Sequence, residues 1–135
     1  MKRIVAVAAC VGLLAAGLAA LPFSPRRSPV TSQVMVHCPN GNQAAFVTPQ
    51  RDTIAVGDSI IWRMTGQVTS DTLVITLKDS AQAWPFGGAM PQGKTSAQTG
   101  EAQVRGTYGY NVHLQCRLPG GGSEPVVIDP DIIIE

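Results

Sequence analysis

The clearest pattern along the chain is a strict alternation of apolar and polar positions between Gly106 and Cys116. One face of this stretch carries Tyr108, Tyr110, Val112, Leu114 and Cys116, and the other carries Gly109, Asn111, His113 and Gln115. Successive side chains of a strand point to opposite faces, so this pattern predicts a long β-strand with one buried face. We expect the other strands of the protein to pack on that face.

Shorter stretches with the same two-residue period predict further strands at residues 33–38, 43–47, 53–62, 72–77, 102–105, 126–128 and 132–134. Gly57-Asp58 divides the stretch 53–62 into two apolar runs joined by a tight connection, which the conformational freedom of glycine permits. Residues 78–100 are expected to form a long polar loop. Short strands at this spacing, without a helical period, predict an all-β, Greek-key β-sandwich that forms a single domain over residues 33–135.

The composition narrows the classes of function. A chain of 135 residues is about one domain. Its 10 Lys and Arg residues nearly balance 9 Asp and Glu residues, for a net charge of +1. Without a basic excess, the protein is not expected to bind nucleic acid.

The N-terminus has the pattern of a targeting segment. Positive residues at Lys2 and Arg3 precede an apolar stretch from Ile4 to Leu21, which ends in small residues and Pro22. This pattern predicts a secretory signal peptide over residues 1–20, and therefore a periplasmic or secreted protein. The alternative is an uncleaved membrane anchor, because the apolar stretch is just long enough to span a bilayer. A membrane is an expected partner only in that second case. Residues 21–32 are expected to form an extended linker or arm.

Two motifs, in this order and at this spacing, resemble those of the cupredoxin family. The first runs from Phe46 and Pro49 through Ile54-x-Val56-Gly57-Asp58-Ser59-Ile60-x-Trp62, and the second is Gly106-Thr107-Tyr108-x-Tyr110. The resemblance covers roughly residues 46–134. It implies the cupredoxin-like β-sandwich fold, in which the first motif precedes the strand leading to one copper ligand and the second leads into the ligand loop.

The positions at which cupredoxins hold copper carry other residues in this chain. A type 1 copper site uses two histidines, a cysteine thiolate and a weak axial methionine. The first histidine would stand near Ser70-Asp71-Thr72, and the cysteine would stand at Val112. The second histidine and the methionine would fall at Gln115 and the glycines that follow. The resemblance therefore extends to the fold but not to electron transfer, and we expect no copper centre and no cofactor.

Two cysteines, Cys38 and Cys116, follow the N-terminal segment, and each lies in phase with the apolar face of its strand. An even number of cysteines in an exported domain predicts a disulfide between them. The alternative is a metal site that combines both cysteines with His37 and His113. It would require a bulge in each strand, because the histidines point away from the cysteine face. A weaker alternative is that the two histidines are neighbours on the outer face and bind a metal there.

The chain contains no motif of a catalytic nucleophile, a zinc protease or a phosphate-binding loop, so we expect no enzymatic activity. An apolar island, Trp84-Pro85-Phe86, followed by Met90, interrupts the polar loop. Such an island either covers the end of the core or forms a contact surface. If it is a contact surface, Trp84, Phe86 and Met90 are the candidate interaction residues.

These observations favour an exported, non-enzymatic binding or accessory module that meets a protein partner through this loop. One alternative is a protein that handles metal through His37 and His113 or exchanges electrons through Cys38 and Cys116. Another is a structural subunit of an extracytoplasmic assembly, in which the arm or the C-terminal strand adds to the sheet of a neighbour.

Overall fold

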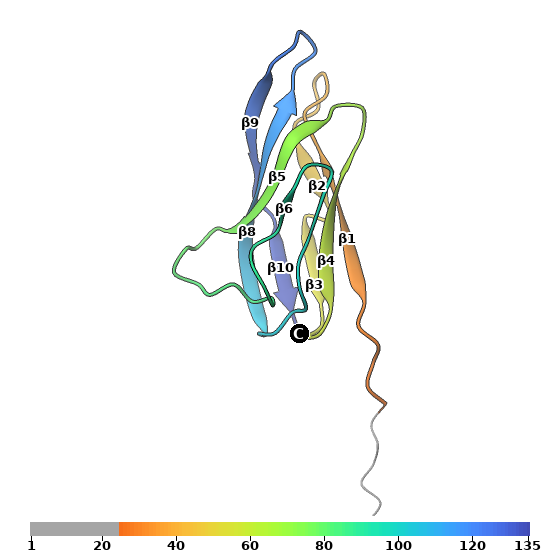
Figure 1. Ribbon diagram of the computed structural model, residues 1–135, viewed down its shortest axis with the longest axis vertical. Helices are drawn as coiled ribbons and strands as arrows, with labels where there is room; N and C mark the ends of the chain where they lie inside the picture. Colours follow the sequence, from red (N-terminus) through yellow and green to blue (C-terminus); the bar gives the residue numbers. More distant parts are fainter. Residues whose placement is uncertain (1–24) are drawn as a thin grey trace, which may run out of the picture.

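The computed structural model describes residues 25–135, and the predicted signal peptide lies outside these described residues. The described residues form ten strands (Figure 1). Their bounds are β1 Thr31–His37, β2 Phe46–Thr48, β3 Arg51–Ile54, β4 Ser59–Thr65, β5 Ser70–Leu77, β6 Gln92–Gly93, β7 Ser96–Gln98, β8 Gly106–Arg117, β9 Ser123–Ile128 and β10 Asp131–Ile134. Within residues 25–135, no helix is long and apolar enough to cross a membrane.

Residues 25–135 are arranged as two sheets that face each other. One sheet has the order β2-β1-β4-β7, and the other has the order β3-β10-β8-β5-β6, with β9 also paired to β8. The pairs β1–β4 and β3–β10 are parallel, whereas the remaining pairs are antiparallel. The chain passes from one sheet to the other after β2, β3, β4, β6 and β7. The prediction of a single all-β, Greek-key sandwich is confirmed.

The core lies between the inner face of β8 and the opposing strands β1 and β4. All five predicted inward residues of β8 are buried, none more than 8% exposed. Trp62 of β4 is fully buried against them, and its indole Nε1 donates a hydrogen bond of 3.1 Å to the hydroxyl of Tyr110. The two rings meet edge to face with centroids 5.5 Å apart. This contact joins the two sheets and satisfies the polar atom of the buried indole.

The first strand begins at Thr31, earlier than predicted, because Asp58 fixes the chain that leads into it. The carboxylate of Asp58 accepts hydrogen bonds from the backbone N–H of Val30 at 2.9 Å and of Ala55 at 3.0 Å. It also accepts a bond of 3.0 Å from the guanidinium of Arg27. The last residues of the predicted arm are therefore part of the sandwich. Asp58 lies between β3 and β4, which belong to different sheets, and Gly57 turns the chain there with a φ of 93°.

The segment between β5 and β8 differs from the prediction. Two short strands, β6 and β7, lie within the expected loop of residues 78–100. The expected strand at 102–105 is absent from the described structure, because its backbone groups bond elsewhere. Ala102 N–H donates to Asp58 O at 2.7 Å, and Gln103 N–H donates to Pro85 O at 2.8 Å. Residues 100–104, which we call the strap, therefore bond both to the turn before β4 and to the loop after β5.

We predict that replacing Asp58 with Asn lowers the free energy of unfolding at pH 7 by about 2 kcal/mol, because charge-assisted hydrogen bonds to buried donors are lost. Burial raises the pKa of Asp58, but the hydrogen bonds from Val30 and Ala55 and the charge of Arg27 outweigh it, so the pKa is lowered from its ordinary value of 3.8. The ionised carboxylate therefore stabilises the fold fully at pH values above 3.8. This stabilisation is lost as the pH falls through the lowered pKa of the folded protein.

Urea unfolding at pH 7 and pH 3 measures both effects. The difference in unfolding free energy between the wild type and Asp58→Asn should be smaller at pH 3 than at pH 7. Asp131→Asn is the matched control, because it removes a carboxylate that makes only an exposed ion pair with Arg51, and it should change stability by less than about 0.5 kcal/mol. Equal effects of the two substitutions would refute the role given to Asp58.

Candidate functional site

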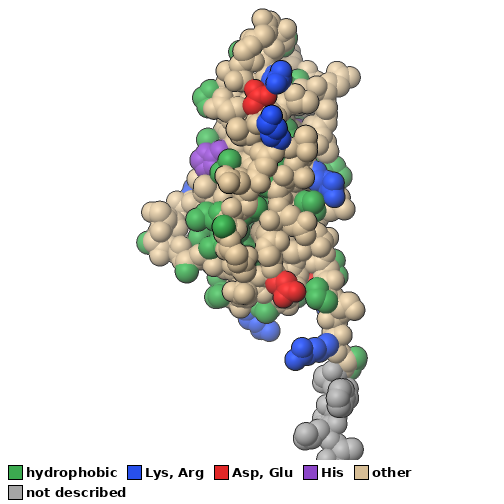
Figure 2. Space-filling view, viewed as in Figure 1, with side chains coloured by type: hydrophobic (Ala, Val, Ile, Leu, Met, Phe, Trp, Pro, Cys, Tyr) green, Lys and Arg blue, Asp and Glu red, His purple; other side chains and the backbone are tan. Residues whose placement is uncertain are grey.

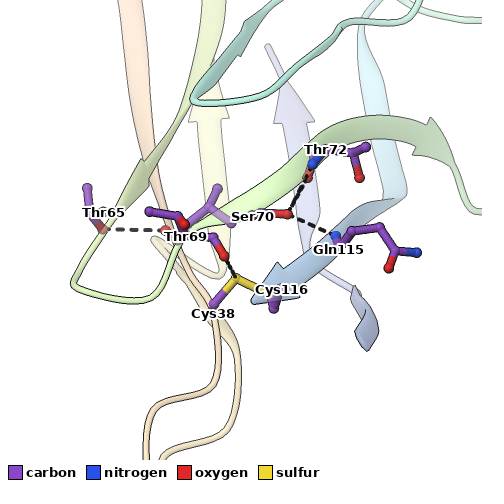
Figure 3. The surroundings of a disulfide bond; sticks show 8 residues. Cys38, Thr65, Thr69, Ser70, Thr72, Gln115 and Cys116 are labelled. Carbon is purple, nitrogen blue, oxygen red and sulfur yellow. Dashed lines mark hydrogen bonds between the residues drawn. A yellow bond between two sulfur atoms is a disulfide. The ribbon is translucent and has the colours of Figure 1, made fainter. Parts of the chain in front are cut away.

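A disulfide between Cys38 and Cys116 joins the two sheets at one end of the sandwich (Figure 3). Cys38 directly follows β1, and Cys116 lies near the end of β8, with their Cα atoms 5.7 Å apart. Both residues are buried, so each side chain completes the inward face of its strand as the sequence pattern indicated. The predicted pair therefore forms the covalent connection between the sheets.

The start of β5 is shaped around this disulfide. The register of β5 on β8 shifts between Ser70 and Leu73, which marks a β-bulge. Ser70 is buried there, and its Oγ accepts a hydrogen bond of 2.8 Å from the backbone N–H of Gln115. The carbonyl of Thr69 accepts a bond of 2.9 Å from Arg117 N–H and lies 3.7 Å from the Sγ of Cys38. The chain at this end is thus held on both sides of the disulfide (Figure 3).

The two histidines lie on different sheets, so the weaker alternative of a metal site shared between them on one outer face does not fit the structure. His37 lies on β1, which pairs with β2 and β4, whereas His113 lies on β8 in the other sheet. His37 stacks on Phe46 and bonds to Thr65, and His113 bonds to Thr76 at 2.9 Å. Each imidazole therefore has its own partners. No group of three or more potential metal-ligating side chains occurs among residues 25–135.

The residues at the family's copper positions do not fit a type 1 copper site. Val112 is fully buried and fills core volume, and its side chain has no lone pair to offer a metal. Thr72 is exposed beside the bulge, and the half-buried Gln115 lies on the outer face of β8. The thiolate that such a site needs is also excluded at Cys116, because its sulfur is bonded to Cys38.

The apolar island of the β5–β6 connection is divided between core and surface. Phe86 is only 3% exposed and belongs to the core cluster, and Pro85 is also fully buried. Phe86 is therefore not available as an interaction residue, which corrects the expectation for this side chain. Trp84 is half-buried, with its ring 5.0 Å from that of Phe86, and Met90 is 45% exposed. Both remain candidates for contact with a partner.

The strap at residues 100–104 holds this connection in place. Gly87 N–H donates to Glu101 O at 2.9 Å, and Gln103 N–H donates to Pro85 O. Phe86 also forms a β-bridge with Ala102. Gly100 lies so close to Gly87 that a Cβ atom on Gly100 would collide with the carbonyl of Gly87. The buried pair Pro85-Phe86 and these bonds fix the loop as part of the folded body.

A cleft at the disulfide end has no counterpart in the sequence predictions. It lies between the turn after β1 and the β4–β5 connection, and it is lined by residues such as Asn40, Gln43 and Gln67. These residue types are common in turns, and nothing in their spacing indicates that the two turns lie side by side. The pairing of β1 with β4 brings them together.

No protein-family model matches the chain, and neither does any curated protein. Among solved structures, the chain is similar to a purple cupredoxin from Nitrosopumilus maritimus, with 20% identity, coverage of 77% of this chain and 99% of that chain, and a TM-score of 0.46. It is also similar to a mutant of amicyanin in its reduced Cu(I) form, with 11% identity, coverage of 81% of this chain and 84% of that chain, and a TM-score of 0.38.

A third similar structure is pseudoazurin from Methylobacterium extorquens AM1, with 12% identity, coverage of 77% of this chain and 74% of that chain, and a TM-score of 0.38. All three are cupredoxins, the family that the two sequence motifs resemble. At these identities the likeness concerns the fold alone. The description of the sandwich rests on the strand order and register of this chain itself.

We predict that the protein contains the Cys38–Cys116 bond and depends on it for stability. Non-reducing digestion and mass spectrometry should identify a linked pair of peptides, with neither cysteine labelled by a thiol reagent in denaturant. The bond closes a loop with a sequence separation of 78 residues, so the double variant Cys38→Ala/Cys116→Ala should lose about 4–5 kcal/mol of unfolding free energy by chain entropy. Two labelled cysteines would contradict the pairing.

We also predict that the protein forms no type 1 copper centre. Copper(II) added to the oxidised protein should produce no intense thiolate-to-copper absorption in the visible spectrum, because the described chain offers no thiolate at the ligand positions. Thermal unfolding should coincide in chelator and in stoichiometric copper, since a ligand that does not bind the native state does not stabilise it. An intense visible band, or a melting temperature raised by copper, would show that the residues do form a copper site.

Proposed function

We propose that this protein is an exported, non-enzymatic binding module that holds a protein partner on the connection between β5 and β6. The observation that carries the proposal is an uncharged, partly apolar surface on a loop that is fixed by its own buried anchor. No residue is charged from Ser80 to Gly93. Along this stretch Ala81, Ala83, Ala89 and Met90 are exposed, together with part of Trp84.

The position of these side chains supports a contact surface. Figure 2 shows hydrophobic side chains gathered where Figure 1 draws the β5–β6 connection. Charged residues are depleted at the centres of protein interfaces, whereas methionine and aromatic residues are enriched there. Asp79 and Lys94 flank the uncharged stretch, so polar groups border the apolar surface, as they do at the rim of an interface.

The anchoring of the loop favours binding on energetic grounds. A loop that must be ordered on binding loses conformational entropy, and this loss weakens the complex. Here the buried Pro85-Phe86 pair and the bonds to Glu101 and Gln103 have already ordered the backbone. The free energy gained by burying Met90 and Trp84 would then contribute to affinity without that loss.

Two ionisable groups of residues 25–135, Asp58 and Tyr110, have a pKa that departs from its ordinary value, and both serve the fold. Asp58 accepts hydrogen bonds from the backbone N–H of Val30, just before β1, and of Ala55, just after β3. Burial raises the pKa of the Tyr110 hydroxyl, which lies in the core against Trp62. Neither group lies in a cleft where a substrate could reach it, which supports a binding role over catalysis. Export is supported by the N-terminal sequence pattern and by the disulfide, because disulfides persist mainly outside the reducing cytosol.

We predict that a photo-reactive amino acid at position 90 forms a discrete crosslink to one protein in the native cell. The same probe at position 35 is the matched control, because Met35 has a similar exposure, 48% against 45%, on a different part of the surface. The substitution Ala89→Asp should abolish the crosslink from position 90, because it introduces a charge into the apolar contact.

Mass spectrometry of the crosslinked species identifies the partner. Circular dichroism of the Ala89→Asp variant should match the wild type, since Ala89 is exposed. The proposal fails if position 90 yields no discrete product, or if positions 90 and 35 yield the same products in similar amounts.

A further inference from the structure

The cleft at the disulfide end is a cavity of about 310 Å³, which lies within the size range of small-ligand sites. One wall is the turn after β1, with Asn40 and Gln43. The other is the end of β4, with Thr65, and the β4–β5 connection, with Gln67 and Val68. His37 also lines the cavity. The cleft lies at the end of the sandwich marked by the disulfide, away from the uncharged β5–β6 loop, so it is independent of the function proposed above.

The lining of the cleft selects for a neutral, polar ligand. Among the described residues that line it, none is Asp, Glu, Lys or Arg. A phosphate, a carboxylate or a metal cation is normally bound by opposite charge, which this cavity lacks. An apolar ligand is also a poor match, because it would remove water from the amide groups without replacing their hydrogen bonds.

The amide side chains of the cleft are available for a ligand. Those of Asn40, Gln43 and Gln67 make no hydrogen bond to other groups within residues 25–135. Each amide has both donor and acceptor atoms, and so does each hydroxyl group of a sugar. A neutral ligand rich in hydroxyl groups could therefore bond to all three amides without leaving any of them unpaired.

The ring of His37 lines the cavity beside these amides, and Phe46 supports it from outside the cavity lining. His37 and Phe46 are stacked with ring centroids 4.2 Å apart and an interplanar angle of 9°, on the outer face of β1 and β2. Thr65 holds the imidazole by a hydrogen bond of 2.9 Å to Nε2. The C–H faces of a pyranose ring pack well on a flat ring surface through dispersion and apolar burial. The combination of neutral amides with a flat ring surface is a match for a glycan.

Both walls of the cleft are ordered before any ligand binds. Asn40 and Gln43 exchange two backbone hydrogen bonds of 3.0 Å, which close the turn that carries them. The disulfide fixes the base of this turn at Cys38. On the other wall, Thr69 O accepts the bond from Arg117 N–H, and Thr65 and Thr69 stand at the two ends of the β4–β5 connection (Figure 3). A preformed cleft of this kind loses little conformational entropy on binding.

We propose that this cleft binds a neutral oligosaccharide, with its hydroxyl groups on the amides of Asn40, Gln43 and Gln67 and one sugar ring beside His37. The test is a titration of the ¹⁵N-labelled oxidised protein, followed by NMR, with three neutral trisaccharides: chitotriose, cellotriose and maltotriose. At least one should cause saturable shifts confined to the two walls of the cleft. The double variant Asn40→Ala/Gln67→Ala should weaken that binding about tenfold, because two hydrogen bonds are lost.

The variant Gln98→Ala is the matched control, because it removes an exposed amide from β7, outside the cleft. It should leave the affinity within about twofold, as expected for a substitution that removes no contact with the ligand. Trigalacturonate and the peptide acetyl-Ala-Ala-Ala-amide serve as a charged and a peptide probe. The proposal is overturned if no neutral trisaccharide binds, if either of these probes binds at the cleft more tightly, or if the double variant binds as well as Gln98→Ala.

Discussion

The packing of the inner face of β8 against β1 and β4 is the constraint on which the rest of the sandwich depends. β8 pairs directly with β5, β9 and β10, so most of the second sheet is built on this strand. The hydrogen bond from Trp62 to Tyr110 fixes the distance and the rotation between the sheets at the centre of the core. From there the alternation along β8 carries Cys116 to the position where it meets Cys38. The covalent connection thus follows from the strand pattern.

This arrangement does not fit the type 1 copper site of the family that the two motifs resemble. A type 1 copper site needs a thiolate at the position where β8 carries the buried Val112. The cysteine of β8 lies four residues further on, at Cys116, and its sulfur is bonded to Cys38. The end of the sandwich is therefore closed by a disulfide. The described surface then offers two features with the character of binding sites. They are the anchored, uncharged loop between β5 and β6 and the neutral cleft beside His37.

The sequence predicted those features that depend on local periodicity. The buried face of β8 and the pairing of Cys38 with Cys116 follow from side-chain phase and cysteine number, so both could be predicted. Which strands become neighbours is not encoded in local periodicity, so the weaker alternative that His37 and His113 share a face could be tested only by the structure, which places them in different sheets. Strands β6 and β7 lack alternating apolar residues and are defined by their partners. The burial of Phe86 depends on the strap at residues 100–104, which a linear pattern does not indicate.

The central claim of this account is that the β5–β6 connection is an ordered part of the folded domain and not a flexible loop. Native-state amide hydrogen exchange tests it most directly. The amides of Gly87 and Gln103, which donate to Glu101 O and Pro85 O, should exchange far more slowly than the amides of the unbonded loop tip at Gly120. Protection of the first two together with the β-strand amides would support the account. Exchange of Gly87 and Gln103 as fast as Gly120 would contradict it.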